Sequence, residues 1–182
     1  MRFAFLDRDG VINRFPGKGK YVTGFSEFKI LPQALKAIRL LTEAGYELAV
    51  ISNQGCVSRK LITKKSLADL TKYMLKEIRE AGGRSPKVYY CVHQKADNCA
   101  CKKPKTLLLK KAVGTRKIKR SEICFIGDSE EDMEAAKNFG CRPVLVLSGR
   151  SKKKDVPALS VKPDAVHKNL WEAARWLVNQ KK

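Results

Sequence analysis

The sequence predicts an α/β fold built on a parallel sheet, and three observations support this class. Short, almost wholly apolar segments recur along the chain, as at residues 2–6, 47–52 and 122–126. Such runs are typical of strands buried on both faces of a parallel sheet. Stretches with helical periodicity separate them, and polar residues follow where they end. Because open parallel sheets bind ligands beyond the carboxyl ends of their strands, the sequence also predicts where a site would lie.

The first half of the chain predicts a strand-helix-strand unit followed by a longer helix. A right-handed crossover between the first two strands would place Ser52 and Asn53 beside Asp7 and Asp9. Helical spacing makes Met74 a core residue. In order, the expected elements are a strand at residues 2–6, a loop at 11–29, a helix at 32–45, a strand at 47–52, a helix at 63–81 and a strand at 87–90.

The second half predicts further alternating strands and helices. Its lysine-rich segment at residues 151–155 is expected to be a mobile loop. No internal repeat or linker divides the chain, so we expect one domain spanning residues 1–182. The expected elements are a helix at residues 105–113, a basic connector at 114–120, a strand at 122–126, a helix ending at Gly140, a strand at 143–147 and a final short strand and helix within 164–178.

Composition excludes some classes of protein and leaves others open. The sequence has no apolar run of the length that a transmembrane helix needs, which is about 18 residues. No secretory pattern follows Arg2, so we expect a cytoplasmic protein with reduced cysteines. We also expect a monomer. The formal charge of +20 favours anionic partners, either phosphorylated metabolites or nucleic acid. A basic surface adapted to the host cytosol explains that charge equally well.

Asp7 and Asp9 end the first expected strand and precede Gly10. Side chains at positions i and i+2 of a strand point the same way, so the two carboxylates can face one reacting centre. One could then bind a cation and attack as a nucleophile while the other transfers a proton. A strand followed by a purely structural acidic turn is the alternative, since Asp and Gly both favour turns.

Cys91, His93, Cys99 and Cys101 place three thiols and one imidazole within eleven positions. This is the number and the softness of ligands in a closed tetrahedral Zn²⁺ site. A closed site leaves no position for water, so the zinc would be structural and would hold the loop that carries Lys102 and Lys103. A chance cluster of core cysteines is less suited to this polar segment.

Three expected strands end in Asp7 and Asp9, in Ser52 and Asn53, and in Asp128. Clustered carboxylates repel one another unless a cation joins them, and hard oxygen ligands with room for water favour Mg²⁺. A phosphoryl group suits the remaining side chains, because lysine neutralises its oxygens, Ser and Asn donate hydrogen bonds, and a carboxylate attacks in line.

Four segments resemble, in order, the four motifs of the haloacid dehalogenase superfamily of phosphatases. They are Asp7-Arg8-Asp9-Gly10-Val11-Ile12-Asn13, Ser52-Asn53-Gln54, Cys101-Lys102-Lys103-Pro104, and Gly127-Asp128 with Asp132. The zinc loop is similar to that of the subgroup containing D,D-heptose 1,7-bisphosphate phosphatase and histidinol-phosphate phosphatase. The resemblance covers nearly the whole chain and implies a three-layer Rossmann-like fold, with helices on both faces of the sheet and little or no cap domain.

The resemblance also implies a role for each matching residue. Asp7 would be the nucleophile that becomes an aspartyl phosphate, and Asp9 would protonate the leaving oxygen and later activate water. Substrate would be bound by Ser52, Asn53, Arg59, Lys102 and Lys103. Mg²⁺ would be bound by Asp7, Asp128 and the backbone carbonyl of Asp9, with Asp132 behind them.

The resemblance does not decide between two substrates. The five-residue spacing between His93 and Cys99 resembles the histidinol-phosphate enzyme, whereas residues 53–59, 89–91 and 146–149 look more like the heptose enzyme. We therefore expect removal of the 7-phosphate of D-glycero-D-manno-heptose 1,7-bisphosphate, with histidinol phosphate as the alternative. Ser129 stands where both relatives commonly have a basic residue. A phosphatase or binder acting on nucleic-acid ends is a further alternative, motivated by the charge.

Overall fold

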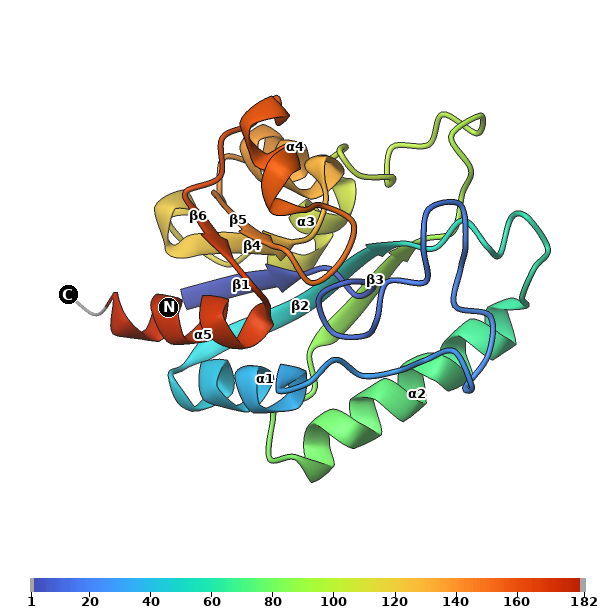
Figure 1. Ribbon diagram of the computed structural model, residues 1–182, viewed down its shortest axis with the longest axis horizontal. Coiled ribbons are helices and arrows are strands. Elements are labelled where there is room, and N and C mark those ends of the chain that lie inside the picture. Colours follow the sequence, from blue (N-terminus) through green and yellow to red (C-terminus); the bar gives the residue numbers. More distant parts are fainter. Residues whose placement is uncertain (1, 181–182) are drawn as a thin grey trace.

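The computed structural model describes residues 2–180 of the chain. Its strands and helices alternate along the sequence (Figure 1). They are β1 (Arg2–Leu6), α1 (Ala34–Glu43), β2 (Tyr46–Asn53), α2 (Lys64–Glu80), β3 (Lys87–Cys91), α3 (Leu107–Val113), η1 (Arg120–Glu122), β4 (Ile123–Gly127), α4 (Glu130–Phe139), β5 (Arg142–Val146), η2 (Lys153–Ala158), β6 (Ala165–His167) and α5 (Leu170–Asn179), where η marks a 3₁₀-helix.

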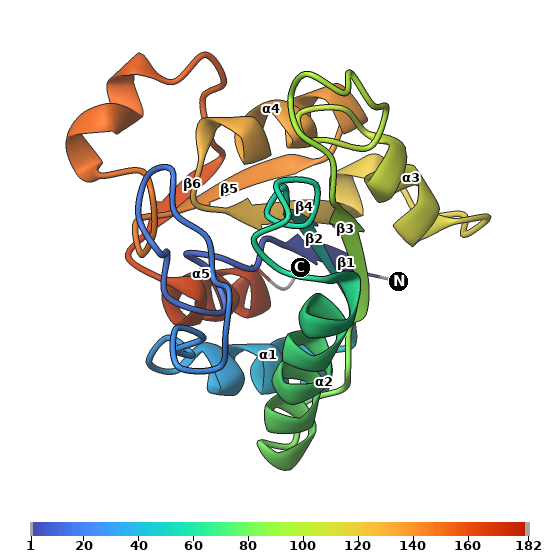
Figure 2. The same cartoon turned by 90° about the vertical axis from the view of Figure 1, so that its right-hand side faces the viewer.

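The strands form one six-stranded sheet in the order β3-β2-β1-β4-β5-β6, and every neighbouring pair is parallel. Helices α1, α2 and α5 cover one face, and α3 and α4 cover the other (Figures 1 and 2). This confirms the predicted three-layer Rossmann-like fold. Residues 7–33, between β1 and α1, contain turns and isolated bridges and no cap domain.

Strand β1 lies at the centre of the sheet and supplies both cores. Its alternate side chains point to opposite faces, as the strand period requires. Ala4 and Leu6 join the core formed with α1, α2 and α5. Phe3 and Phe5 join the core formed with α3 and α4. A strand buried on both faces must be apolar throughout, which is why residues 2–6 show no alternation of polar and apolar residues.

The strand order reverses at β1, because β2 and β3 lie on one side of it and β4 to β6 on the other. Parallel sheets open a crevice at such a reversal, beyond the carboxyl ends of the strands. The backbone N–H of Asp7 donates to the carbonyl of Ile126 at 3.0 Å, so the ends of β1 and β4 are joined there. The topology thus places the residues after β1 and β4 at one edge.

The predicted elements agree with the structure to within about two residues, and the ends follow local hydrogen bonding. Thr63 accepts a hydrogen bond from the Ser66 backbone N–H at 3.0 Å and so caps α2. The segment expected to be a mobile loop instead begins the 3₁₀-helix η2, because the Asp155 carboxylate accepts from the Lys152 backbone N–H at 2.8 Å. Within residues 2–180, no helix is long and apolar enough to cross a membrane.

Candidate active site

A pocket of about 70 Å³ opens at the reversal point, at the carboxyl ends of β1, β2 and β4. The strands deliver its acidic and polar residues, the loop after β3 delivers a lysine, and residues 15–21 form part of its rim. The side chains that line it include Asp7, Asp9, Phe15, Lys20, Tyr21, Ser52, Asn53, Lys103, Asp128, Glu131 and Arg150. The predicted convergence of three strand ends on one site is therefore seen in the fold.

Lys103 lies at the buried centre of this pocket. Its ammonium nitrogen is 2.9 Å from Oδ1 of Asp7 and 2.6 Å from Oδ1 of Asp132, and it donates to the Ile51 carbonyl at 3.0 Å. Only 3% of the lysine side chain is exposed. Burial alone would lower the pKa of Lys103, but the two carboxylates outweigh burial and raise it. The lysine is therefore a fixed positive charge between two acids.

Three carboxylates, those of Asp7, Asp128 and Asp132, each place an oxygen within 4.8 Å of the others. Burial raises the pKa of Asp7 to about 6; the Lys103 ammonium opposes this shift, and the carboxylates of Asp132 and Asp9 add to it. Burial also raises the pKa of Asp128, and the neighbouring carboxylates of Asp7 and Asp132 add to the shift. One ammonium does not balance this cluster. Its buried hard oxygen donors fit a divalent cation such as Mg²⁺.

Asp132 differs from the other two acids because both its oxygens are already engaged. Oδ2 accepts from the backbone N–H groups of Asp128 and Ser129 at 3.2 and 3.1 Å, and from the Ser129 hydroxyl at 2.6 Å. Oδ1 faces Lys103. By contrast, Asp7 Oδ1 is buried and lies 2.9 Å from the Lys103 ammonium, but it accepts no well-directed hydrogen bond. Asp132 thus orients its neighbours, whereas Asp7 keeps coordination capacity.

Asp128 is held between two glycines. Its Oδ2 accepts from the Arg150 backbone N–H at 2.6 Å. Side chains built on Gly10 or Gly149 would overlap the Asp128 carboxylate. Gly10 also has φ +88°, a conformation that favours glycine. Glycine at these positions therefore makes room for the carboxylate at the bottom of the pocket.

Ser52 and Asn53 end β2, and Asn53 ties that strand to the loop carrying Lys103. The Lys103 backbone N–H donates to Asn53 Oδ1 at 3.0 Å. The Asn53 amide in turn donates to the Lys103 carbonyl and to Glu131 Oε2, both at 3.3 Å. These bonds explain how a loop after β3 positions a lysine beneath the end of β1.

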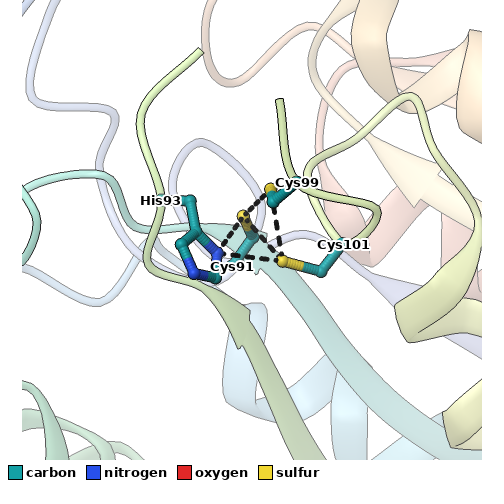
Figure 3. Close-up of side chains that lie close together, drawn as sticks. All are labelled: Cys91, His93, Cys99 and Cys101. Carbon is teal, nitrogen blue, oxygen red and sulfur yellow. Dashed lines mark hydrogen bonds between the residues drawn. The ribbon is translucent and has the colours of Figure 1, made fainter. Parts of the chain in front are cut away.

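The predicted zinc ligands form one compact cluster (Figure 3). The Sγ atom of Cys101 lies 3.2 Å from that of Cys91 and 3.4 Å from that of Cys99, and 3.2 Å from Nδ1 of His93. Cys91 Sγ lies 3.5 Å from Cys99 Sγ and 3.8 Å from His93 Nδ1. A tetrahedral zinc site with bonds of about 2.3 Å has edges of about 3.8 Å. The cluster fits that geometry after small outward shifts of the ligands.

Comparison with known proteins agrees with this site. A family profile described as HAD-hydrolase-like matches residues 100–173. The D-glycero-beta-D-manno-heptose-1,7-bisphosphate 7-phosphatase of Neisseria meningitidis is 37% identical over 153 residues, which is 84% of this chain and 81% of that protein. The protein of the same name from Pseudomonas aeruginosa is 35% identical over 145 residues, 80% of each chain. This chain belongs to the haloacid dehalogenase family of phosphatases.

The structure of this phosphatase is also similar to a solved member of the family. The D,D-heptose 1,7-bisphosphate phosphatase from B. bronchiseptica, complexed with magnesium and phosphate, superimposes with a TM-score of 0.89. The two proteins are 28% identical, and the match covers 100% of both chains. The resemblance predicted from four short motifs therefore extends to the whole fold.

Two predicted substrate residues of the phosphatase lie outside the pocket lining. Arg59 is exposed, with its guanidinium 5.9 Å from the centre of the Tyr21 ring at the rim. Lys102 lines a neighbouring hollow between the loop after β3 and α4, and this hollow is also lined by Glu131 and Glu134. Each cation therefore lies beside a residue that lines the pocket, Arg59 beside Tyr21 and Lys102 beside Glu131.

Sequence reasoning missed two further cations that line the phosphatase's pocket, Lys20 and Arg150. The Arg150 guanidinium lies 5.6 Å from the Phe15 ring centre and 4.0 Å from Glu131 Oε1. Ser129, where relatives are commonly basic, is buried and directs its hydroxyl to Asp132. No motif marks Arg150 as a site residue. The adjacent Ser148-Gly149 pair was the only signal for Arg150 in the sequence.

Proposed function

We propose that this phosphatase removes the 7-phosphate of D-glycero-D-manno-heptose 1,7-bisphosphate, using Mg²⁺ and an aspartyl phosphate on Asp7. The observation that carries the chemistry is the buried Asp7 carboxylate at the point where the strand order reverses, with Lys103 2.9 Å away and Asp128 beside it. The relatives that bear this name support the choice of substrate.

In the proposed reaction, Asp7 attacks the phosphorus atom while Ser52 and Asn53 donate hydrogen bonds to the phosphoryl oxygens. Lys103 holds Asp7 in place and offsets its charge. Mg²⁺, when bound by Asp7, Asp128 and the backbone carbonyl of Asp9, would neutralise charge on the phosphoryl group. Asp9 gives a proton to the leaving oxygen and later takes one from the attacking water.

We also propose that Cys91, His93, Cys99 and Cys101 bind a structural Zn²⁺. All four positions would be filled by protein ligands, so this metal has no open site for chemistry. Its effect would be to fix the loop that leads to Lys103.

The chain would act as one domain of residues 1–182, as a monomer in the cytoplasm.

The experiment that tests this function is a substrate comparison with added Mg²⁺. We expect kcat/KM for the heptose bisphosphate to exceed that for histidinol phosphate. The short spacing of the zinc loop favours histidinol phosphate, and a clear preference for it would overturn the substrate assignment. Failure to release phosphate from any monoester would overturn the phosphatase assignment.

A nucleic-acid function is the alternative from a different class, suggested by the charge of +20. Contacts to phosphates make binding steeply dependent on salt. We expect no oligonucleotide binding near physiological salt. Tight, salt-sensitive binding with no turnover of sugar phosphates would favour this alternative.

A further inference from the structure

Three polar side chains donate hydrogen bonds to the Asp9 carboxylate at the pocket wall. Oδ1 accepts from Asn13 Nδ2 at 2.8 Å and from Arg8 Nη2 at 2.9 Å. Oδ2 accepts from Gln54 Nε2 at 2.7 Å and from Arg8 Nη2 at 3.1 Å. Both oxygens are therefore held from two directions, which leaves the carboxylate little freedom to turn.

Arg8 is the most unusual member of this group because its side chain is 0% exposed. Its guanidinium lies 5.6 and 5.7 Å from the ring centres of Phe28 and Tyr90. Within residues 2–180, Asp9 is its only ion-pair partner. A buried guanidinium is costly unless it is paired and hydrogen-bonded, so such an arrangement fixes both partners strongly.

Gln54 joins this ion pair to the phosphate-binding end of β2. Its Oε1 accepts from Arg8 Nη2 at 3.1 Å, while its Nε2 donates to Asp9 and to the Ser52 hydroxyl, the latter at 3.2 Å. The cation on one side and the carboxylate on the other leave one favourable orientation of the amide. Gln54 is 1% exposed and does not line the pocket.

We propose that Gln54, supported by Arg8, is the positioning residue that aims the Asp9 carboxylate at the leaving oxygen of the substrate. The inference rests on the proposed function, in which Asp9 transfers the proton. Gln54 touches neither the substrate nor the reacting atoms and acts through Asp9. It also fixes the position of the Asp9 side chain relative to Ser52, since one amide group contacts both.

The proton transfer defines what the positioning must achieve. In the first step, an Asp7 oxygen forms a bond to phosphorus and the bond from phosphorus to the leaving oxygen breaks. That oxygen keeps the bonding electrons and takes the proton from Asp9. In the second step, Asp9 takes a proton from water, and the water oxygen replaces Asp7 on phosphorus. Alcohol leaving groups need the first proton, whereas p-nitrophenolate leaves readily without it.

The test compares kcat/KM for a sugar phosphate and for p-nitrophenyl phosphate, because kcat/KM reports the step in which the leaving group departs. The variants are Gln54→Met, which removes the amide at similar size, and Gln54→Glu, which keeps an acceptor for Arg8 but removes the donor to Asp9. Gln33→Met, at an exposed position, is the matched control.

General acid catalysis typically increases the reaction rate ~10²–10⁴-fold, and an Asp9 side chain that points away from the leaving oxygen would lose part of this increase. We expect both Gln54 variants to lose about tenfold or more in kcat/KM for the sugar phosphate, and about threefold or less for p-nitrophenyl phosphate. Gln33→Met should match the wild type for both. Equal losses for the two substrates, or no loss, would overturn the inference.

Two further measurements separate this inference from the proposed function. Asp9→Asn should show the same selective loss more strongly, and an unchanged Asp9→Asn enzyme would remove the role of Asp9 itself. If the wild type hydrolyses no phosphate monoester, the proposed function fails. Crystal structures of the wild type and Gln54→Met then test, independently of activity, whether Gln54 sets the orientation of the Asp9 side chain. An Asp9 side chain in the same orientation in both would contradict it.

Discussion

The ammonium of Lys103 lies 2.6 Å from Oδ1 of Asp132, and the two side chains are 3% and 0% exposed. The lysine comes from the loop after β3 and the acid from the first turn of α4. Because Lys103 also lies 2.9 Å from Asp7, one buried cation joins three separate parts of the chain. The site therefore depends on this ion pair for its construction as well as for its chemistry.

Replacing Lys103 with Met should both destabilise and inactivate the protein. Within residues 2–180, Lys103 is the one cation paired with Asp7 or Asp132. Breaking a buried ion pair at one partner costs about 3–5 kcal/mol, because the other charge stays buried. Urea unfolding should show this loss, and phosphate release should stop. Lys72→Met removes an exposed ion pair and should change neither. Wild-type stability in Lys103→Met would contradict the prediction.

Asp7→Asn should abolish turnover and leave the fold intact. The amide is similar in size but cannot attack phosphorus as a carboxylate does. It also removes one of three clustered negative charges, so the metal-free variant should be no less stable than the wild type at neutral pH. Phosphate release and far-ultraviolet circular dichroism measure the two effects. Substantial remaining activity would refute the nucleophile assignment.

Gly149→Ala should weaken Mg²⁺ binding, since the new methyl group would overlap the Asp128 carboxylate. A shift of Asp128 by even a small distance alters the metal site, so we expect the Mg²⁺ concentration for half-maximal activity to rise severalfold. Gly24→Ala is the control, because a methyl group there meets no atom within 4 Å. Identical Mg²⁺ dependence of the two variants would show that close packing on Asp128 is unimportant.

Removal of zinc should lower the melting temperature and reduce activity by loosening the loop before Lys103. Structural zinc contributes directly to folding free energy. Cys99→Ser should lose bound zinc in metal analysis, whereas Cys141→Ser should keep it, because Cys141 is a buried core residue outside the cluster. A melting temperature unaffected by a strong chelator, with zinc shown to be gone, would argue against a structural metal.

The stabilisation of the protein by Mg²⁺ should increase between pH 5 and pH 7. Burial raises the pKa of Asp7 to about 6 from 3.8, so without metal the folded state holds a proton that the unfolded state has lost. The stability associated with this group is therefore present below pH 3.8 and is lost as the pH rises through about 6. Mg²⁺ binds the ionised carboxylates, so the stability that Mg²⁺ adds increases as the pH rises.

Melting temperatures with and without Mg²⁺ at the two pH values measure this effect. We expect the larger Mg²⁺-induced increase at pH 7. Asp7→Asn should show a weaker dependence, because it lacks the titrating carboxylate. Equal increases at pH 5 and pH 7 in the wild type would show that proton and metal do not compete at this site.

Local patterns in the sequence predicted the fold class and most of the site for identifiable reasons. Strand β1 has to be apolar on both faces, so its carboxyl end is visible where Asp7 interrupts the run. The cluster of Cys91, His93, Cys99 and Cys101 is equally visible, because its four residues lie within residues 91–101 and form a local loop. The order of the four motifs then implied the family, which the relatives confirm.

Other features were invisible to local patterns because they depend on contacts between distant segments. Arg8 is an ordinary basic residue in the sequence, yet its side chain is enclosed by Phe28 and Tyr90 and paired with Asp9. The contact of Lys102 with substrate stays a prediction, and the hollow that Lys102 lines, beside the pocket of Asp7, was not foreseen from the sequence.

The sequence by itself determined the chemical groups of this site, since the residue types and their places after apolar strands follow from local preference and burial. Tertiary structure alone decided how those groups are aimed. Lys103 lies 96 residues after Asp7 in the chain (103 minus 7) and meets it only because β3, which precedes the loop carrying Lys103, is joined through β2 to β1 in one sheet. The orientation of Asp9 by Gln54 likewise required the crossover from β1 to β2, because hydrogen bonds across 45 residues have no signature in local sequence.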